Sequence, residues 1–355
     1  MTTQTSGDLT ADRRAEYARH YAQANDFAAA ADLIEQALDL APGHLPFLSL
    51  QGEWLAKAGR TAEAAAVWAQ MLRLDAQDRF GAQLKLASIG LTETPDAPPP
   101  AYVESLFDDF APRFDTSLVE KLDYHAPLRL ADAIVAALGD AKAIRHAVDL
   151  GCGTGLMGER LRGRASFLEG IDLSAGMLKR ARGKGIYDRL EKGDVTSPAF
   201  AETEPGRADL AVAADVYIYL GDLAAAFGLA AQLLETNGLY AFTVEAHDGP
   251  EDYAVRPSLR YAHSQAYLGR ALADAGFDPA AQFRLQFLVS RAVGPIDKVF
   301  LTYDLGYELP DAYTRTVAAA PVQAQPEASD GDARDALWKR IWQTKRTQVV
   351  VLCTA

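Results

Sequence analysis

The stretch from His146 to Arg162, HAVDLGCGTGLMGERLR, constrains the fold more than any other part of the chain. Its short apolar run, AVDL, is followed at once by closely spaced glycines and then by a helical pattern. A buried strand that turns sharply through glycines into a helix is typical of nucleotide-binding α/β sheets, because the amides at the helix start can approach a ligand. The stretch therefore predicts a ligand loop at the edge of a parallel sheet.

Strand-like and helical runs alternate from about Ala143 onward. The strand-like runs are HAVDLG, SFLEGIDLS, YDRLEKGDV, ADLAVAADV, GLYAFTVE and FRLQFLVSR, and helical patterns cover 156–163, 175–184, 222–235 and 264–275. Such alternation predicts a doubly wound α/β domain whose parallel sheet is covered by helices on both faces. Two later runs, DKVFLTYDL and TQVVVLCT, compete for the last strand. We favour TQVVVLCT because it is β-branched, which leaves a long insertion or appendage around 294–346.

The segment before this domain is alanine-rich and helical in period up to about Gly90. Two parts of it superimpose at a 34-residue offset, the period of tetratricopeptide repeats. Ala18 and Gly52, and Ala30 and Ala64, are then the small residues that let paired helices approach closely. A generic helical bundle is the alternative. Because TETPDAPPP breaks the helical pattern, we expect an all-α tetratricopeptide-like domain at 1–95, a helical lid or connector at 101–142, and the α/β domain at 143–355.

Composition and charge exclude several classes of function. The formal net charge of −13 argues against nucleic acid as a partner, because phosphate backbones are bound by clustered Lys and Arg. Two cysteines are too few for a disulfide framework or a Cys-based zinc site, and no His, Asp and Glu cluster has convincing metal-ligand spacing, so we expect no metal. The first residues lack a signal-peptide pattern and no run is long enough for a membrane span. We expect a cytoplasmic protein.

The glycine loop matches two ligand patterns. From Gly153 it spells G-x-G-x-x-G, the dinucleotide fingerprint, but that pattern needs its first glycine at the end of the strand, and Gly158 would lie a full turn inside the helix. Asp149 suits a ligand with a cationic amino-acid end and would repel a pyrophosphate. Asp172 ends the next strand, where it can bind ribose, and Asp194 ends the third, where it can reach an adenine amino group. We therefore favour S-adenosylmethionine over a nicotinamide cofactor and interpret the dinucleotide fingerprint as an accident of Gly158 falling three residues after Gly155.

Five motifs now support a family resemblance. VDLGCGTG, GIDLSAGML, KGDV, ADLAVAADVYIYLGDL and LLETNGLYAFTVE resemble, in order and spacing, the motifs of class I S-adenosylmethionine-dependent methyltransferases, over roughly 102–277. The helical segment, with YVESLFDDFAPRFDTSLVEKLDYHAP and LRYAHSQAYLGRALADAGF, looks like the tetratricopeptide-repeat-containing predicted methyltransferases of bacteria. The resemblance implies a Rossmann-like seven-stranded methyltransferase sheet and S-adenosylmethionine as the cofactor.

The resemblance also implies which residues bind that cofactor. In related quinone-type methyltransferases a helix of the FDDFAPRFD kind folds over the cofactor, so Phe114, with Phe107 and Phe110, would cover the sulfonium; helical spacing alone equally allows a core role. The other implied residues are Asp149, Gly151 and Gly153 at the methionine end, Asp172 and Leu173 after the second strand, Met177, Asp194 and Val195 around the adenine, and Ala214 and Asp215 beside the methyl group.

Three residues are candidates for handling the acceptor. Methyl transfer from a sulfonium is an in-line displacement, so positioning supplies much of the acceleration and a base is optional. His263 precedes a helix that Ser264 would cap, and it either removes a proton or packs locally. Glu245 ends the fifth strand, where an acid can orient His263 or bind the acceptor. Tyr217 follows the fourth strand and either bonds the acceptor or is a rim aromatic.

Two functions remain open at this point. The first is methyl transfer, to oxygen or nitrogen, on a small-molecule or carrier-bound acceptor, with the repeats supporting the lid or docking a protein partner. The second is an adaptor or sensor that binds S-adenosylmethionine without turnover while the repeats bind a partner. A nicotinamide-dependent oxidoreductase is disfavoured by the position of Asp149.

Overall fold

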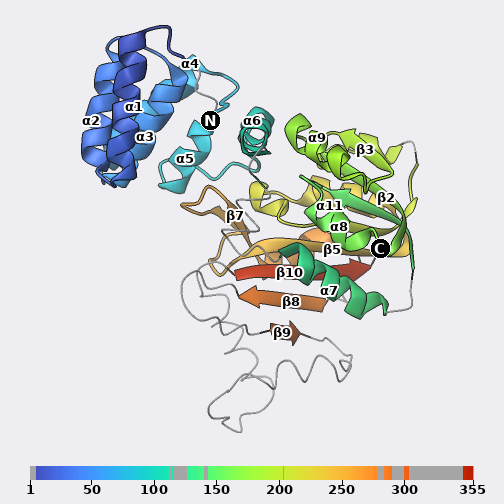
Figure 1. The fold of residues 1–355 in the computed structure, drawn as a ribbon. Coiled ribbons are helices and arrows are strands. Elements are labelled where there is room, and N and C mark those ends of the chain that lie inside the picture. The colour runs from blue at the N-terminus through green and yellow to red at the C-terminus, as the bar shows by residue number, and fades with distance from the viewer. Residues whose placement is uncertain are drawn as a thin grey trace, which may run out of the picture. The chain divides into compact units, whose positions relative to one another are not determined.

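The chain forms two compact units in the computed structural model, which describes residues 5–111, 114, 126–139, 143–202, 204–277, 284–289, 300–303 and 347–354. The helical unit comprises Met1–Phe110 together with the loop Val255–Arg260. The α/β unit comprises Ala111–Ala254 and Tyr261–Ala355 (Figure 1). No described helix is long and apolar enough to cross a membrane.

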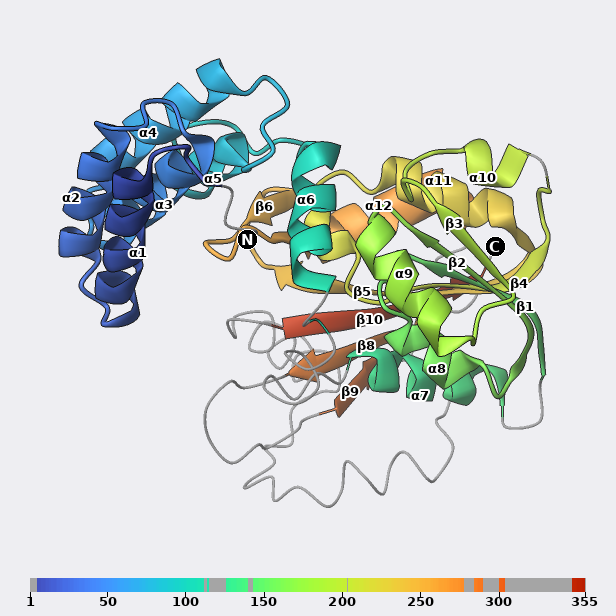
Figure 2. The same cartoon turned by 45° about the horizontal axis from the view of Figure 1, so that its top comes forward.

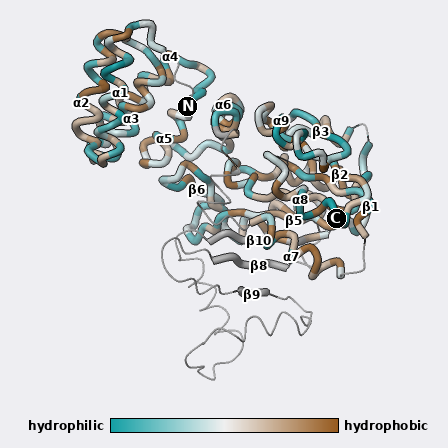
Figure 3. Tube along the Cα trace, in the orientation of Figure 1, coloured by the Kyte–Doolittle hydropathy of each residue, from teal (hydrophilic) through white to brown (hydrophobic). Residues whose placement is uncertain are grey.

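The helical unit is a succession of helices in which each of the first four packs on the next. Hydrophobic and hydrophilic stretches alternate along α1 and α2 (Figure 3), because each helix buries one face. Asp8 and Asp26 cap α1 and α2 by accepting backbone hydrogen bonds. The helices are α1 (Leu9–Gln23), α2 (Phe27–Leu38), α3 (Leu45–Lys57), α4 (Thr61–Leu74), α5 (Ala82–Ser88) and α6 (Pro100–Phe110).

Small residues bring the helices of this unit together. A Cβ at Gly52 in α3 would overlap the indole of Trp68 in α4, so only glycine allows this approach. Ala18, Ala30 and Ala64 are fully buried at the corresponding contacts. The positions predicted from the 34-residue offset are therefore packing positions. Such packing is common to closely packed helical hairpins, so the tetratricopeptide class of these helices stays a proposal.

The α/β unit is built on a mixed sheet with the order β3-β2-β1-β4-β5-β10-β8-β9. The first five of these pair in parallel, while β10 is antiparallel to both β5 and β8. The strands are β1 (Ile144–Leu150), β2 (Ala165–Asp172), β3 (Arg189–Lys192), β4 (Ala208–Ala213), β5 (Leu234–His247), β6 (Tyr253–Val255), β7 (Tyr261–Ser264), β8 (Arg284–Val289), β9 (Phe300–Tyr303) and β10 (Thr347–Thr354).

Seven of these strands form the predicted Rossmann-like sheet. In their order across the sheet they are β3, β2, β1, β4, β5, β10 and β8. The favoured run TQVVVLCT is β10 and lies between β5 and β8, whereas FLTY, from the competing run, is the edge strand β9. The described sheet has ten strands because β9 adds an edge and because β5 extends far enough to pair with β7, which pairs with β6.

Helices cover both faces of the sheet (Figure 2). On one face, aromatic residues of β5 pack with α11 and α12 in a core that includes Phe227, Tyr240 and Phe242. On the other face, α7 and α8 contribute Leu130 and Met157 to a second core. This two-sided burial confirms the doubly wound architecture. The helices are α7 (Ala126–Leu138), α8 (Leu156–Leu161), α9 (Ala175–Lys184), α10 (Ala199–Glu202), α11 (Ala224–Leu233) and α12 (Gln265–Asp274), with a 3-10 turn, η3 (Tyr217–Tyr219).

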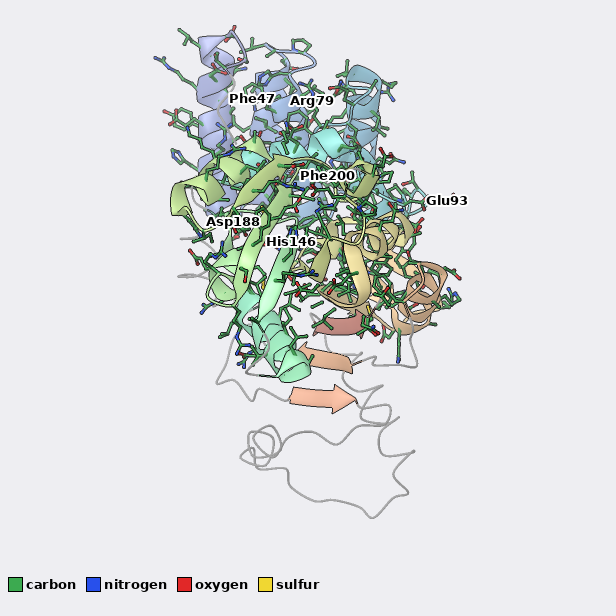
Figure 4. All side chains as sticks on the ribbon, turned by 90° about the vertical axis from the view of Figure 1, so that its right-hand side faces the viewer. Phe47, Arg79, Glu93, His146, Asp188 and Phe200 are labelled. Atoms are coloured by element: carbon green, nitrogen blue, oxygen red, sulfur yellow. The ribbon has the colours of Figure 1, made fainter. Side chains whose placement is uncertain are left out.

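A buried charge network joins four segments of the α/β unit. Glu169 on β2 is fully buried and accepts from Arg207 at 2.8 Å, Arg189 at 2.6 Å and the His146 ring at 3.1 Å. His146 lies on β1 (Figure 4). Although burial alone would raise the pKa of Glu169, these hydrogen bonds and charges lower it to about 2. The network therefore keeps a buried carboxylate ionised.

Candidate functional site

The glycine loop between β1 and α8 has a backbone that demands glycine. Gly151, Gly153 and Gly155 have φ angles of +68°, +55° and +93°, in the left-handed region that other residues rarely adopt. A Cβ at Gly151 would also lie 2.5 Å from a methyl of Val216. At Gly153, by contrast, an added Cβ would meet no atom within 4 Å. The loop is therefore tightly packed at Gly151 and open at Gly153, where a ligand can approach the backbone.

The loop lies at the place in the sheet where such folds bind ligands. β1 pairs with β2 on one side and with β4 on the other, so the chain order reverses here. In open α/β sheets, ligands bind outside the carboxyl ends of the strands at this switch point. The carboxyl ends of β1, β2, β3 and β4 carry most of the residues predicted to bind a cofactor.

Asp172, at the end of β2, forms hydrogen bonds with both the glycine loop and the N-cap residue of α9. Its Oδ2 accepts the Gly153 amide at 2.8 Å and its Oδ1 accepts the Ser174 amide at 2.8 Å. Ser174 in turn caps α9 by accepting the amide of Met177, whose side chain is buried. Leu173, which lies between Asp172 and Ser174 in the chain, is partly buried. The predicted ribose acid thus contacts the predicted methionine loop directly.

Asp194 follows β3 at the same edge of the sheet. In the β2–β3 pairing, Asp172 is opposite Lys192, so Asp194 lies two residues beyond that level. Its Oδ1 accepts both the amide and the hydroxyl of Thr196, at 2.8 and 2.7 Å. Val195 beside it is buried, as an apolar neighbour of an adenine ring would be. The predicted adenine pair and the ribose acid therefore come from adjacent strands.

Asp215, after Ala214 at the end of β4, holds an unusual backbone conformation. Its φ is +58°, which is rare for a residue other than glycine. Its amide donates to the Thr243 hydroxyl at 2.8 Å, and that hydroxyl donates to Oδ1 of Asp215 at 3.0 Å. Thr243 on β5 therefore fixes the turn after β4. Strained residues of this kind cluster at functional sites.

Asp149, the acid predicted to suit a cationic amino-acid end, is a buried carboxyl group. It is only 1% exposed, and the hydroxyl of Tyr187 donates to its Oδ2 at 2.6 Å. Burial raises the pKa of Asp149 to about 7, against the opposing effect of the Tyr187 bond. The predicted contact of Asp149 with an amino-acid end stays a prediction.

Gly158 has a packing role that is independent of the dinucleotide fingerprint. A Cβ at Gly158 would overlap the hydroxyl of Tyr187, and added Cβ atoms at Gly155 and Gly170 would come within 3.0 Å of the same ring. These three glycines form a slot for Tyr187. Sequence reasoning missed Tyr187 altogether, although a glycine inside a helix, where it is normally unfavourable, was a usable signal.

His263 does not lie open to an acceptor. It is fully buried, and its Nε2 lies 2.9 Å from the carbonyl oxygen of Leu220 and 3.0 Å from that of Gly221. Two acceptors at Nε2 require a proton there, and burial lowers the pKa of the ring to about 4. His263 therefore fixes the loop after β4 as a neutral donor, which corrects its assignment as an accessible base. Ser264 caps α12 as predicted, accepting the Tyr267 amide.

Tyr217 belongs to the core. It is fully buried, and its hydroxyl is hydrogen-bonded to the hydroxyl of Tyr240. Its ring packs edge-on against those of Phe242 and Phe227, with ring centroids 5.4 Å and 5.8 Å away. Burial raises the pKa of its hydroxyl. This geometry removes Tyr217 from the candidates for acceptor binding, because η3 turns its side chain into the aromatic core rather than toward the rim.

Glu245 is the catalytic candidate that keeps a partly exposed position at the sheet edge. It lies on β5 opposite Ala262 of β7 and Gln348 of β10. Because side chains alternate along a strand, Glu245 shares the face of Thr243, the residue that holds Asp215. Phe114 is partly buried, and the residues on either side of it lie outside the described part of the chain, so the lid stays a prediction.

No group of three or more His, Cys, Asp or Glu within the described residues could hold a metal ion. Both cysteines, Cys152 in the loop and Cys353 on β10, are buried and free.

Comparison with known proteins assigns the central part of the chain. Residues 148–242 match the family described as a methyltransferase domain. This segment is a methyltransferase domain. It begins in β1 and ends in β5, so it contains the glycine loop, Asp172, Asp194 and Asp215. The match agrees with the predicted class of domain, a methyltransferase, over this segment.

Individual relatives match only parts of the chain. A 79-residue segment is 35% identical to the regulatory protein NosR of Stutzerimonas stutzeri and covers 22% of this chain but only 10% of NosR. The ubiquinone biosynthesis O-methyltransferase of Burkholderia vietnamiensis is 26% identical over 171 residues, covering 44% of this chain and 72% of that enzyme. Among solved structures, this chain is similar to an S-adenosylmethionine-dependent methyltransferase of Thermotoga maritima that is described as a possible histamine N-methyltransferase. The match covers 71% of this chain and 98% of the Thermotoga chain, with 15% sequence identity and a TM-score of 0.45.

Proposed function

We propose that this protein is an enzyme that transfers the methyl group of S-adenosylmethionine to an oxygen or nitrogen of a small-molecule or carrier-bound acceptor. The observation that carries the proposal is the bond between Asp172 and the Gly153 amide. This bond holds Asp172, the acid proposed to bind ribose, against an open glycine backbone at the switch point of the sheet. The family match over 148–242 supports the reaction class.

The residues at this edge fit the parts of the proposed cofactor. The open backbone at Gly153 has room for the amino-acid end, and the carboxylate of Asp172 beside it is a group that accepts hydrogen bonds from ribose hydroxyls. Asp194 and the buried Val195 suit the amino edge and face of adenine. When bound, S-adenosylmethionine supplies an electrophilic methyl group whose transfer leaves a neutral thioether.

The protein's contribution to the reaction is mainly positioning. The rigid turn at Asp215, fixed by Thr243, would form the wall beside the transferred methyl group and align the acceptor for in-line attack. Glu245 on the same face would accept the proton that a hydroxyl or ammonium acceptor loses, or hold that group by a hydrogen bond. The O-methyltransferase named among the relatives makes a hydroxyl acceptor a natural first test.

The helical unit has a supporting role in this proposal. We infer that α1 to α5 are two tetratricopeptide-like hairpins with a capping helix, because the small residues of the 34-residue offset occupy helix contacts. Such a unit would support the lid or dock a protein partner. Two buried free thiols suit a reducing compartment, so we propose the cytoplasm as the location.

Calorimetry of the full chain with S-adenosylhomocysteine and with NAD tests the cofactor. Binding of the first and not of the second is expected; binding of NAD alone would refute the proposal. A methyl-release screen against phenols, amines and acyl-carrier substrates then tests turnover. Tight binding of S-adenosylhomocysteine without methyl release from any class, together with a protein partner captured by the helical unit, would instead establish the adaptor or sensor.

A further inference from the structure

The contact between Tyr187 and Asp149 carries an inference about how the proposed site is regulated. Tyr187 lies just before β3, 38 residues after Asp149, and was not part of any predicted site. Gly155, Gly158 and Gly170 leave space for its ring, and its hydroxyl donates a hydrogen bond to Oδ2 of Asp149 at 2.6 Å. A side chain held so closely from a distant segment sets the position of the carboxylate it contacts.

The carboxylate of Asp149 has no counter-ion within the described part of the chain. Its surroundings there are the Tyr187 hydroxyl, the Gly158 amide, the negative charge of Asp172, and the Cys152 thiol, which burial keeps neutral by raising its pKa. No cationic side chain among the described residues bonds to it. A buried carboxylate without a positive partner is costly in its ionised form, so it holds a proton until a cation arrives.

We propose that Tyr187 is the positioning residue of the glycine loop and that its bond to Asp149 makes binding of the cofactor's ammonium group depend on release of a proton from Asp149. The inference rests on the proposed function, because S-adenosylmethionine supplies the ammonium. In the free protein Asp149 is largely protonated below neutral pH. As the ammonium binds near the loop, Asp149 releases its proton to solvent and becomes the missing counter-ion.

The Tyr187 hydroxyl determines the pH at which this happens. Its hydrogen bond favours the ionised carboxylate, so it lowers the pKa of Asp149 toward neutrality, to about 7, against the effects of burial and of Asp172. Without the hydroxyl, proton release requires a higher pH. The apparent affinity equals the affinity for the ionised form multiplied by the fraction of Asp149 that is ionised. Affinity for an ammonium-bearing ligand should therefore rise about tenfold between pH 6 and pH 8.

Calorimetric titration of the full chain with S-adenosylhomocysteine at several pH values tests this coupling. The wild type should show the tenfold rise, Tyr187→Phe should move the midpoint to higher pH, and Asp149→Asn should abolish the pH dependence. The matched ligand 5′-methylthioadenosine, which lacks the amino-acid end, should bind equally at all these pH values. The matched control Tyr21→Phe, at an exposed tyrosine of α1, should behave as the wild type.

A second readout needs no ligand. In protein labelled with carbon-13 at aspartate carboxyls, the Asp149 resonance, assigned through its loss in Asp149→Asn, should titrate near pH 7 in the wild type and higher in Tyr187→Phe. An unchanged midpoint in Tyr187→Phe, or wild-type affinity that is flat from pH 6 to 8, would overturn the inference. If the wild type binds no S-adenosylhomocysteine at any pH while the carboxyl titration is as expected, the proposed function fails and the Tyr187 control of Asp149 stands.

Discussion

Gly158 is packed against Tyr187 so closely that a Cβ at that position would overlap the tyrosine hydroxyl. The substitution Gly158→Ala should therefore displace the ring or the start of α8. We expect it to lower the free energy of unfolding by about 1–3 kcal/mol, although alanine is the better helix former. Chemical denaturation measures this. Gly163→Ala is the control, because a Cβ there meets nothing within 4 Å; equal stability of the two variants would contradict the packing argument.

Asp172→Asn should weaken both the loop and ligand binding. Both carboxylate oxygens accept backbone amides, and an asparagine offers one acceptor and turns an NH₂ group toward the other amide. A loss of about 1–3 kcal/mol in stability is expected from the unsatisfied amide, with at least a tenfold weaker Kd for S-adenosylhomocysteine by calorimetry. The control Asp252→Asn removes a half-exposed ion pair with Arg270 and should change neither quantity measurably.

Glu169→Gln should be among the most destabilising conservative changes in the α/β unit. It leaves Arg207, which is 7% exposed, without its carboxylate, and breaking a buried pair in this way costs about 3–5 kcal/mol. The pKa of Glu169 is lowered to about 2, so its contribution is complete above its unfolded pKa and is lost as pH falls through 2. The difference between wild type and variant should therefore shrink on acidification from pH 5. A difference that stays constant down to pH 2 would show that the charge is not responsible.

His263→Gln tests the corrected role of the histidine. The pKa of the buried ring is lowered to about 4, so between about pH 6.5 and 4 the unfolded chain binds a proton that the folded protein excludes. Wild-type stability should therefore fall as pH drops through this window, and His263→Gln, whose amide still donates to the carbonyls of Leu220 and Gly221, should lose part of that dependence.

The same variant separates positioning from base catalysis. Once an acceptor is known, His263→Gln should retain most of the wild-type kcat, whereas a general base would cost about 10²–10⁴-fold. The control His20→Gln changes an exposed residue of α1 and should leave the pH dependence of stability intact. A loss of activity in that catalytic range, with stability unchanged, would restore His263 as a base.

The elements and the cofactor edge were predictable from sequence because they depend on local patterns. Alternating apolar runs placed β1 to β5, and the β-branched run at 347–354 correctly indicated the strand between β5 and β8. Asp172 and Asp194 could be placed at one edge because parallel strands end together. The contact partners of His263, Tyr217 and Tyr187 were not predictable, since each contact joins segments that are distant in the sequence and depends on how those segments pack.

The place of β10 in the sheet has a consequence for biosynthesis. β8 and β9 precede β10 in the chain, yet β10 separates β5 from β8. While the ribosome is still making the residues before 347, β5 has an open backbone edge next to the strand end that carries Glu245. Open edges of this kind recruit other strands, so the nascent protein is vulnerable to mispairing until β10 emerges and inserts.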